Sequence, residues 1–220
     1  MPLQAHVVAP SRTAHVLEII KGAILSGDLA AGSPLVETDL ALQLGVSKTP
    51  VREALKTLEG TGLVVIRPYL GATVREMSYE DAAAVYDMRL LLEPEAVRRT
   101  VAAGGRLSAA ERALERAREA DGGVARSAAN REFHRALYEG CGNPLLVASL
   151  DGLRDQTSLV SVAAWARRAS WETEAAEHEE ILGAAREGRA DEAADLVRRH
   201  VAAFLDRLPK QDIDPAPPSP

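Results

Sequence analysis

Apolar residues recur at helical spacing near the start of the chain. Val16, Ile19, Ile20 and Ile24 are separated by the three- and four-residue steps that place side chains on one face of a helix. The segment 26–34, SGDLAAGSP, then breaks the pattern with two glycines and a proline. The pattern therefore predicts a first helix that ends close to residue 26.

Two short helices joined by a tight turn are predicted next. The first covers about 38–44, and a Gly-Val pair follows it as the turn. Ser47 is a suitable N-cap for the second helix, which tolerates Pro50 in its first turn and ends in the segment 59–62, EGTG. A helix, a glycine turn and a second helix have the spacing of a helix-turn-helix.

The helix after Ser47 separates its apolar positions from its cations. The apolar positions are Val51, Leu55 and Leu58, and the cations are Lys48, Arg52 and Lys56. Because the two sets fall on different faces, packing of the apolar face would leave the cations outward. Ordinary solvation explains such a face in most helices, but in the second helix of a helix-turn-helix it also suits the DNA major groove.

Two strand-like segments complete this first part of the chain. Residues 64–66 and 72–74 are rich in β-branched and apolar types, and Pro68 and Gly71 lie between them. The pattern predicts a two-stranded wing.

From Ser78 to Leu208 the pattern is helical throughout, with about six helices separated by glycine-containing loops. Pro94 is expected to kink or split one of them near Glu93, unless it begins a new helix. The predicted fold class is mostly α, with an N-terminal winged helix-turn-helix and a C-terminal all-α helical bundle.

Composition and charge narrow the classes of function. The net charge is −6, yet residues 1–76 carry seven Lys or Arg and seven Asp or Glu, so the rest of the chain holds the whole excess. Within residues 38–75 the balance is basic, with five Lys or Arg against three Asp or Glu. Such a locally basic patch on an acidic protein favours a nucleic-acid partner. The lone Cys141 excludes an intramolecular disulfide and is expected to be a small core residue, and the sequence shows neither a signal peptide nor an 18-residue apolar run. We expect a cytoplasmic protein without a membrane partner.

Three histidines on separate predicted helices share faces with apolar residues: His134, His178 and His200. An isolated histidine of this kind is usually a core residue with a hydrogen-bond partner. Three together also suit a transition-metal site, because imidazoles from separate helices are common ligands in a bundle. Asn130, one turn before His134, would add an oxygen on the same side.

Three histidines and an open position also describe catalytic zinc, so a metal-dependent enzyme is an alternative. The HEEIL segment at His178 lacks the second histidine of zinc proteases, and the sequence has neither a serine-centred nucleophile elbow nor a glycine-rich phosphate loop. These absences disfavour an enzyme. A third interpretation keeps the histidines as core residues of a dimerisation scaffold.

The stretch GVSKTPVREALKTLEGTGLV, followed by RPYLGATV, resembles the winged helix-turn-helix of GntR-type bacterial transcription regulators. The resemblance implies a homodimer on a palindromic operator in double-stranded DNA. It also implies operator contacts from Thr38, Ser47, Lys48, Thr49, Arg52, Arg67 and Gly71. Family members often have arginine where this chain has Lys48, and lysine cannot form the planar two-bond contact with guanine. Arg52 is therefore the better candidate for reading a base.

The second part resembles the FCD-type helical ligand-binding domain of the FadR branch of that family. The segments that carry the resemblance are MRLLLEPEAV, NREFHRALYEGCGNPLL, WETEAAEHEEIL and ADLVRRH. The resemblance implies a divalent transition metal, zinc with nickel or manganese as alternatives, held by Asn130, His134, His178 and His200. Many relatives have an aspartate at the position of Asn130, and an amide oxygen is a weaker, neutral donor.

A small carboxylate effector is the partner that such a metal site implies. Three imidazoles and an amide leave the charge of a divalent ion uncompensated, and Arg89 would clamp the other end of the acid. The alternative for Arg89 is a surface ion pair with Glu93. The expected protein is a repressor with a DNA-binding domain at 12–76, an effector and dimerisation domain at 78–208, and disordered ends at 1–11 and 209–220.

Overall fold

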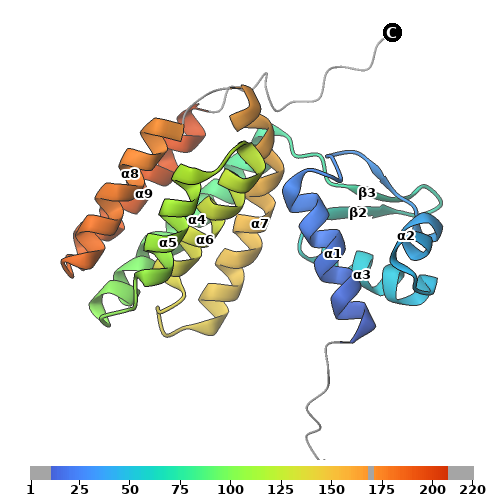
Figure 1. The fold of residues 1–220 in the computed structure, drawn as a ribbon, viewed down its shortest axis with the longest axis horizontal. Helices are drawn as coiled ribbons and strands as arrows, with labels where there is room; N and C mark the ends of the chain where they lie inside the picture. The colour runs from blue at the N-terminus through green and yellow to red at the C-terminus, as the bar shows by residue number, and fades with distance from the viewer. Residues whose placement is uncertain (1–10, 168–170, 208–220) are drawn as a thin grey trace, which may run out of the picture. The chain divides into compact units, whose positions relative to one another are not determined.

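The structure, a computed structural model, describes residues 11–167 and 171–207, and only the backbone of 161–167. It divides into two compact units, Met1–Arg75 and Glu76–Pro220 (Figure 1). The ends predicted to be disordered, 1–11 and 209–220, lie outside the described residues except for Ser11. That residue caps the first helix, because its Oγ accepts a hydrogen bond of 3.1 Å from the backbone N–H of Ala14.

The three predicted helices of the first unit are present. They are α1 (Arg12–Ser26), α2 (Glu37–Leu44) and α3 (Lys48–Gly60). The turn between α2 and α3 depends on Gly45, whose φ of 63° lies in the left-handed region that favours glycine. Ser47 occupies the N-cap position of α3 as predicted, but its side chain makes no capping hydrogen bond.

The wing is larger than the sequence pattern predicted. The hairpin of β2 (Val64–Arg67) and β3 (Gly71–Val74) is joined by a third strand, β1 (Pro34–Leu35), in the order β1-β3-β2 with antiparallel pairing. The prediction of two strands was wrong because β1 has only two residues, too few to show alternation, and its proline had been assigned to the breaker after α1.

The core of the first unit forms where α1 packs on α3. Its buried side chains include Val16, Ile20, Ile24, Val51, Leu55 and Leu58. Ile19, which the spacing placed on the same face, is instead exposed at 40%. It lies at the edge of the apolar stripe, where the period of the helix carries a side chain out of contact.

The second unit contains six helices within the part of the chain that the structure describes. They are α4 (Tyr79–Ala102), α5 (Ser108–Glu119), α6 (Gly123–Tyr138), α7 (Pro144–Arg167), α8 (Trp171–Arg186) and α9 (Ala190–Arg207). Helix α4 packs against α6, α7 and α9, while α8 packs against α5 and α9 (Figure 1). The predicted fold class is confirmed. None of the described helices is both long and apolar enough to cross a membrane.

Pro94 does not split α4, so a split near Glu93, one of the two predicted outcomes, was wrong. The helix runs unbroken through the proline, which is buried in the bundle. A proline cannot donate to the carbonyl four residues earlier, which here belongs to Leu90. Arg198 of α9 donates to that carbonyl from Nη1 through a long hydrogen bond of 3.5 Å. Tertiary contacts therefore replace the missing helical bond.

Candidate nucleic-acid interface and metal centre

Helix α3 presents a cationic face whose other side is anchored in the core. Lys48, Arg52 and Lys56 are exposed, while Val51, Leu55 and Leu58 are at most 2% exposed. The packing of the apolar side thus leaves the cations outward, as the pattern predicted.

The other predicted operator contacts are also exposed in the first unit. Thr38 lies in the first turn of α2, and Ser47 and Thr49 lie at the start of α3 next to Lys48. Arg67 and Gly71 are paired across the β2–β3 hairpin. Gly71 has a φ of 87°, so a side chain there would be strained.

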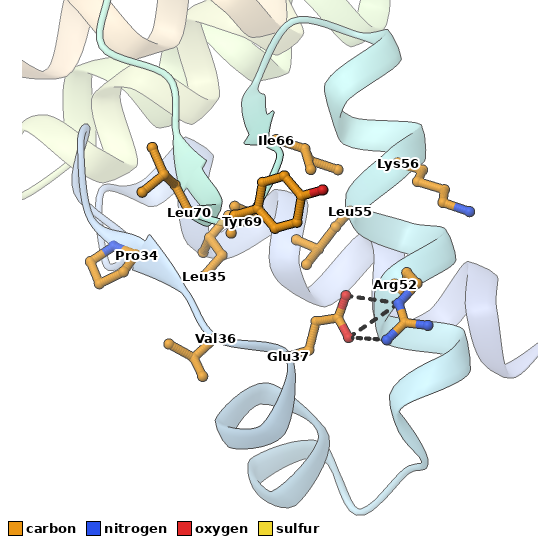
Figure 2. Close-up of a pocket in the computed structure, with 12 residues that line it drawn as sticks. Pro34, Leu35, Val36, Glu37, Arg52, Leu55, Lys56, Ile66, Tyr69 and Leu70 are labelled. Carbon is orange, nitrogen blue, oxygen red and sulfur yellow. Dashed lines mark hydrogen bonds and ion pairs between the residues drawn. The ribbon is translucent and has the colours of Figure 1, made fainter.

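Arg52 is held by a residue that had not been singled out as a site residue, Glu37 of α2. Nε of Arg52 donates to both carboxylate oxygens at 2.9 and 3.2 Å, and Nη2 donates to Oε2 at 2.7 Å. Figure 2 shows the two side chains pointing toward one another from the two helices. The hydrogen bond from Arg52 lowers the pKa of Glu37, which is therefore ionised at neutral pH.

A groove of about 560 Å³ lies beside this ion pair (Figure 2). Its apolar wall includes Leu35, Leu55 and Ile66, and the hairpin tip with Tyr69 and Leu70 closes one side. Tyr69, which has a φ of 66°, is fully exposed, and Leu70 is largely exposed. The wing thus carries apolar side chains at its tip in addition to Arg67.

The three predicted metal histidines converge in the second unit. His134 comes from α6, His178 from α8 and His200 from α9, and one ring nitrogen of each lies within 4.8 Å of those of the other two. All three side chains are buried, which confirms the prediction that they face inward. The Nε2 atoms of His178 and His200 are 3.2 Å apart.

Carboxylates fix the orientation of two of these rings. Nδ1 of His134 is 2.6 Å from Oε1 of Glu93, and Nδ1 of His200 is 2.6 Å from Oε2 of Glu177. Each carboxylate is an acceptor, because Glu93 and Glu177 both have lowered pKa values. The imidazoles therefore donate from Nδ1, which leaves the lone pair of each Nε2 directed toward the cluster.

Interactions with neighbouring cations keep both glutamates ionised. Burial alone would raise the pKa of Glu93, but the charge of Arg89 and the hydrogen bond from His134 hold it well below its ordinary value. Burial opposes ionisation of Glu177 too, but hydrogen bonds from His200 and Arg207 lower its pKa to about 2. Arg207 donates to both oxygens of Glu177 at 2.8 and 3.1 Å.

The residues present fit a transition metal. Zinc-bound imidazole nitrogens lie about 2.0–2.1 Å from the ion, so two of them on one ion are roughly 3 Å apart, close to the separation of the Nε2 atoms of His178 and His200. Nε2 of His134 and Oδ1 of Asn130 are both buried and have no hydrogen-bond partner among the described residues. Burial lowers the pKa of His134 and of His178 well below the ordinary value, so both are neutral, as ligands must be.

Arg89 is not at the surface. It is 2% exposed, and its Nε donates to Oε2 of Glu93 at 2.9 Å. The alternative interpretation, a surface ion pair between Arg89 and Glu93, was right about the partner but wrong about the exposure, because the pair is buried. The guanidinium carbon lies 4.8 Å from the centre of the Tyr86 ring.

A second buried arginine, Arg154 of α7, was missed. It is 4% exposed, and its Nη2 donates to the backbone oxygen of Asn130 at 3.3 Å, while its Nε has no partner among the described residues. Burial and then the charge of Arg89 lower the pKa of Arg154 to about 10. The residue remains a cation at neutral pH, so Arg89 and Arg154 are both charged near the carboxylate of Glu93.

The remaining sequence candidate, Cys141, is a buried core residue as expected. The residues that sequence reasoning missed, Glu37, Glu177 and Arg154, share one property. Each acts on a partner that is distant in sequence or on another helix, and local spacing carries no signal of that kind.

Comparison with known proteins identifies both units. The chain matches the family model of bacterial regulatory proteins, gntR family, over residues 12–74 and that of the FCD domain over residues 84–203. A probable D-xylose utilization operon transcriptional repressor from Paenarthrobacter nicotinovorans is 33% identical over 197 residues, which cover 86% of this chain and 85% of the relative.

Solved structures agree with the family models. A putative transcriptional regulator GntR from Rhodococcus sp. RHA1 has a TM-score of 0.80 at 27% identity, with 89% of this chain and 96% of that chain covered. Escherichia coli McbR/YncC has a TM-score of 0.78 at 24% identity, with 89% and 97% covered, and supports the fold. The chain therefore belongs to the GntR family of bacterial regulatory proteins, and it is a DNA-binding transcriptional regulator with an FCD domain rather than an enzyme.

Proposed function

We propose that this regulator is a dimeric repressor whose operator binding responds to a small carboxylic acid bound beside a metal ion in the helical unit. The observation that carries the proposal is the convergence of three buried imidazoles, two of them oriented by carboxylates, next to a buried arginine whose Nε has no partner in the described part of the chain. Repression is suggested by the name of the relative from Paenarthrobacter nicotinovorans.

The first unit would bind one half of a palindromic operator. In a winged helix-turn-helix the second helix enters the major groove, so the exposed face of α3 would carry the base contacts. Arg52 would read a base, Lys48 and Lys56 would contact phosphates, and Thr38, Ser47 and Thr49 would fix the register. The wing would contact the DNA backbone through Arg67 and Gly71. A palindrome requires two copies, which the unit at 78–208 would hold together.

In the second unit His134, His178 and His200 would hold the ion, with Asn130 as a fourth, weaker donor. This set of neutral nitrogen ligands suits zinc or nickel better than a hard ion such as magnesium. The bound ion would supply a Lewis-acidic position for one carboxylate oxygen of the effector. The chain itself would supply the positive surroundings through Arg89 and Arg154.

The charge balance favours an anionic effector. Two buried guanidiniums interact with the carboxylate of Glu93, and a divalent ion would add two further positive charges to the same region. Uncompensated charge in a dry core is costly, so an anion would bind favourably there. Nε of Arg154 has no partner within the residues that the structure describes and could donate to the acid, whereas Nε of Arg89 is already bound to Glu93.

The test is metal content followed by acid binding. Protein purified without chelator or affinity metal is analysed for bound metal, and calorimetry then measures binding of a panel of small mono-, hydroxy- and dicarboxylic acids with and without metal. We expect about one ion per chain and acid binding that disappears after metal removal, with operator affinity changed by the same acid. His178→Ala should lose the ion, while His15→Ala, which alters an exposed histidine of α1, should keep it.

The contact between His178 and His200 favours one second candidate. A hydrogen bond between two neutral imidazoles at 3.2 Å also explains their separation, and the unit would then be a dimerisation scaffold with a polar core. Equal metal content in wild type and His178→Ala, together with an unchanged dimer, would establish the scaffold and exclude the sensor.

A further inference from the structure

We infer that Glu37 positions Arg52 for reading guanine, by binding one edge of its guanidinium and leaving the opposite edge free for the base. This inference rests on the proposed base-reading role of Arg52. It assigns a function in DNA discrimination to an acidic residue on a surface whose partner is a polyanion.

The contact is specific in its geometry. Glu37 binds the side edge of the guanidinium, formed by Nε and Nη2, through three contacts of 2.7 to 3.2 Å. Two parallel bonds between planar groups fix the plane and the direction of both partners. Figure 2 shows the third nitrogen, Nη1, pointing away from the carboxylate. The free end edge, formed by Nη1 and the second hydrogen of Nη2, can still donate two bonds to O6 and N7 of guanine.

Stability alone does not account for the pair. Both side chains are partly exposed, at 56% and 32%, and exposed ion pairs contribute little to folding. A carboxylate beside the DNA also repels phosphates, which lowers affinity for every sequence. The contact is therefore better explained by orientation, because a long arginine side chain otherwise loses rotamer freedom when it binds a base.

The neighbouring pair on α3 provides a matched control. Lys56 donates to Glu53 at 3.1 Å within one helix, and Glu53 is also acidic, with a side chain 52% exposed against 32% for Glu37. Glu53→Gln removes the same charge from the same unit without removing the carboxylate that holds Arg52. It therefore reports the effect of removing an acidic partner from a cation of α3 while the contact between Glu37 and Arg52 is kept.

The experiment measures discrimination rather than affinity. Wild-type protein first selects an operator from a random DNA library. Dissociation constants are then measured at one salt concentration for that operator and for random DNA of equal length. They are also measured for operators in which each guanine in turn is replaced by 7-deazaguanine. The modified base lacks the N7 acceptor. The affinity of the wild-type protein should fall about tenfold when the guanine that Arg52 reads in each half-site is replaced.

Glu37→Gln should reduce the ratio of operator to random affinity by about tenfold and abolish the effect of 7-deazaguanine at that position, while random DNA binds equally or more tightly. Glu37→Asp keeps the negative charge but has a shorter side chain that no longer holds Arg52. It should lose the same discrimination without binding random DNA more tightly. Glu53→Gln should keep the wild-type ratio. Thermal melts confirm that each variant is folded.

Two results would overturn the inference in distinguishable ways. If Glu37→Gln strengthened operator and random binding by the same factor and kept the 7-deazaguanine effect, Glu37 would be only a repulsive charge, and base reading by Arg52 would stand. If Arg52→Ala kept the wild-type ratio, Arg52 would not read a base, and the role proposed for α3 would fail together with that of Glu37.

Discussion

His134 donates from Nδ1 to Oε1 of Glu93 across 2.6 Å, although the two residues are 41 positions apart and lie on different helices. The same carboxylate accepts from Arg89 through its other oxygen. One buried group thus fixes a candidate metal ligand and a candidate effector contact at the same time. A change at Glu93 should therefore affect both functions.

Replacing Glu93 by Gln should lower metal affinity about 10- to 100-fold, the usual effect of losing a hydrogen-bond partner behind a ligating histidine. It should also destabilise the fold by roughly 3 kcal/mol, because a buried Arg89 is left without its counter-charge. Chelator competition and urea unfolding measure the two effects. Glu95→Gln alters an exposed glutamate of the same helix and should change neither. A fully stable Glu93→Gln with wild-type metal affinity would contradict the assigned role.

Replacing Asn130 by Asp should tighten metal binding and weaken binding of an anionic effector. Oδ1 of Asn130 is buried and lacks a partner among the described residues, so a carboxylate placed there gains a charged ligand bond. The added negative charge also compensates part of the positive charge that attracts the acid. Competition with a coloured chelator gives the first effect and calorimetry gives the second. Loss of metal in this variant would show that residue 130 does not face the ion.

Acid should destabilise the metal-free protein and release metal from the loaded one. Burial holds the pKa of His134 and His178 well below 6.5, so the unfolded chain binds more protons than the folded chain once the pH falls to that region. Their contribution to stability is therefore complete above about pH 6.5 and is lost progressively as the pH falls toward the lowered values. Protons also compete with the ion for the same nitrogens.

Thermal melts of EDTA-treated and metal-loaded protein, recorded from about pH 8 to about pH 5, check this dependence. The loaded protein should melt higher at neutral pH, and the difference should close in acid. A difference that stays constant over the range would exclude histidine ligands.

Arg52→Ala should reduce the difference in binding free energy between operator and random DNA by about 1–3 kcal/mol. Lys56→Ala should weaken binding to operator and to random DNA by the same factor and lower the slope of log affinity against log salt concentration by about one. Both side chains line the groove, but Arg52 is bound to Glu37 (Figure 2), whereas Lys56 is paired with Glu53 of its own helix. Fluorescence anisotropy at several salt concentrations separates the two effects. Equal specificity ratios for wild type and Arg52→Ala would remove Arg52 from base reading.

Local spacing was sufficient to predict the inward histidines and the cationic face of α3, because both patterns repeat within one helix. It could not predict the contacts between helices. Glu177 lies 23 positions from His200, and Glu37 lies 15 positions from Arg52, so only the tertiary fold brings these pairs together. The prediction of a split at Pro94 failed for the same reason, because Arg198, which donates to the carbonyl left without its helical bond, belongs to a helix about 100 residues later.

Arg154 offers a test in which stability and effector binding should change in opposite directions. Its guanidinium is buried, its Nε has no partner among the residues described, and burial lowers its pKa, so the folded protein gains little from its charge. Replacement by Met, which has a similar length and no charge, should therefore be neutral or stabilising by about 1 kcal/mol. Binding of the acid should nevertheless weaken by about 1.5–3 kcal/mol, the value of a hydrogen bond to a charged group.

Urea unfolding and calorimetry on the same preparations measure the two quantities. Arg135→Met is the control, because Arg135 is exposed and pairs with Glu139 and Asp151 at the surface, so both quantities should stay near wild type. A structural role for Arg154 predicts the reverse pattern, with a less stable protein that binds acid normally. Because a divalent ion would add positive charge beside Arg154 and a bound acid would compensate it, the metal-loaded and acid-free protein should be the state in which the cost of Arg154 is largest.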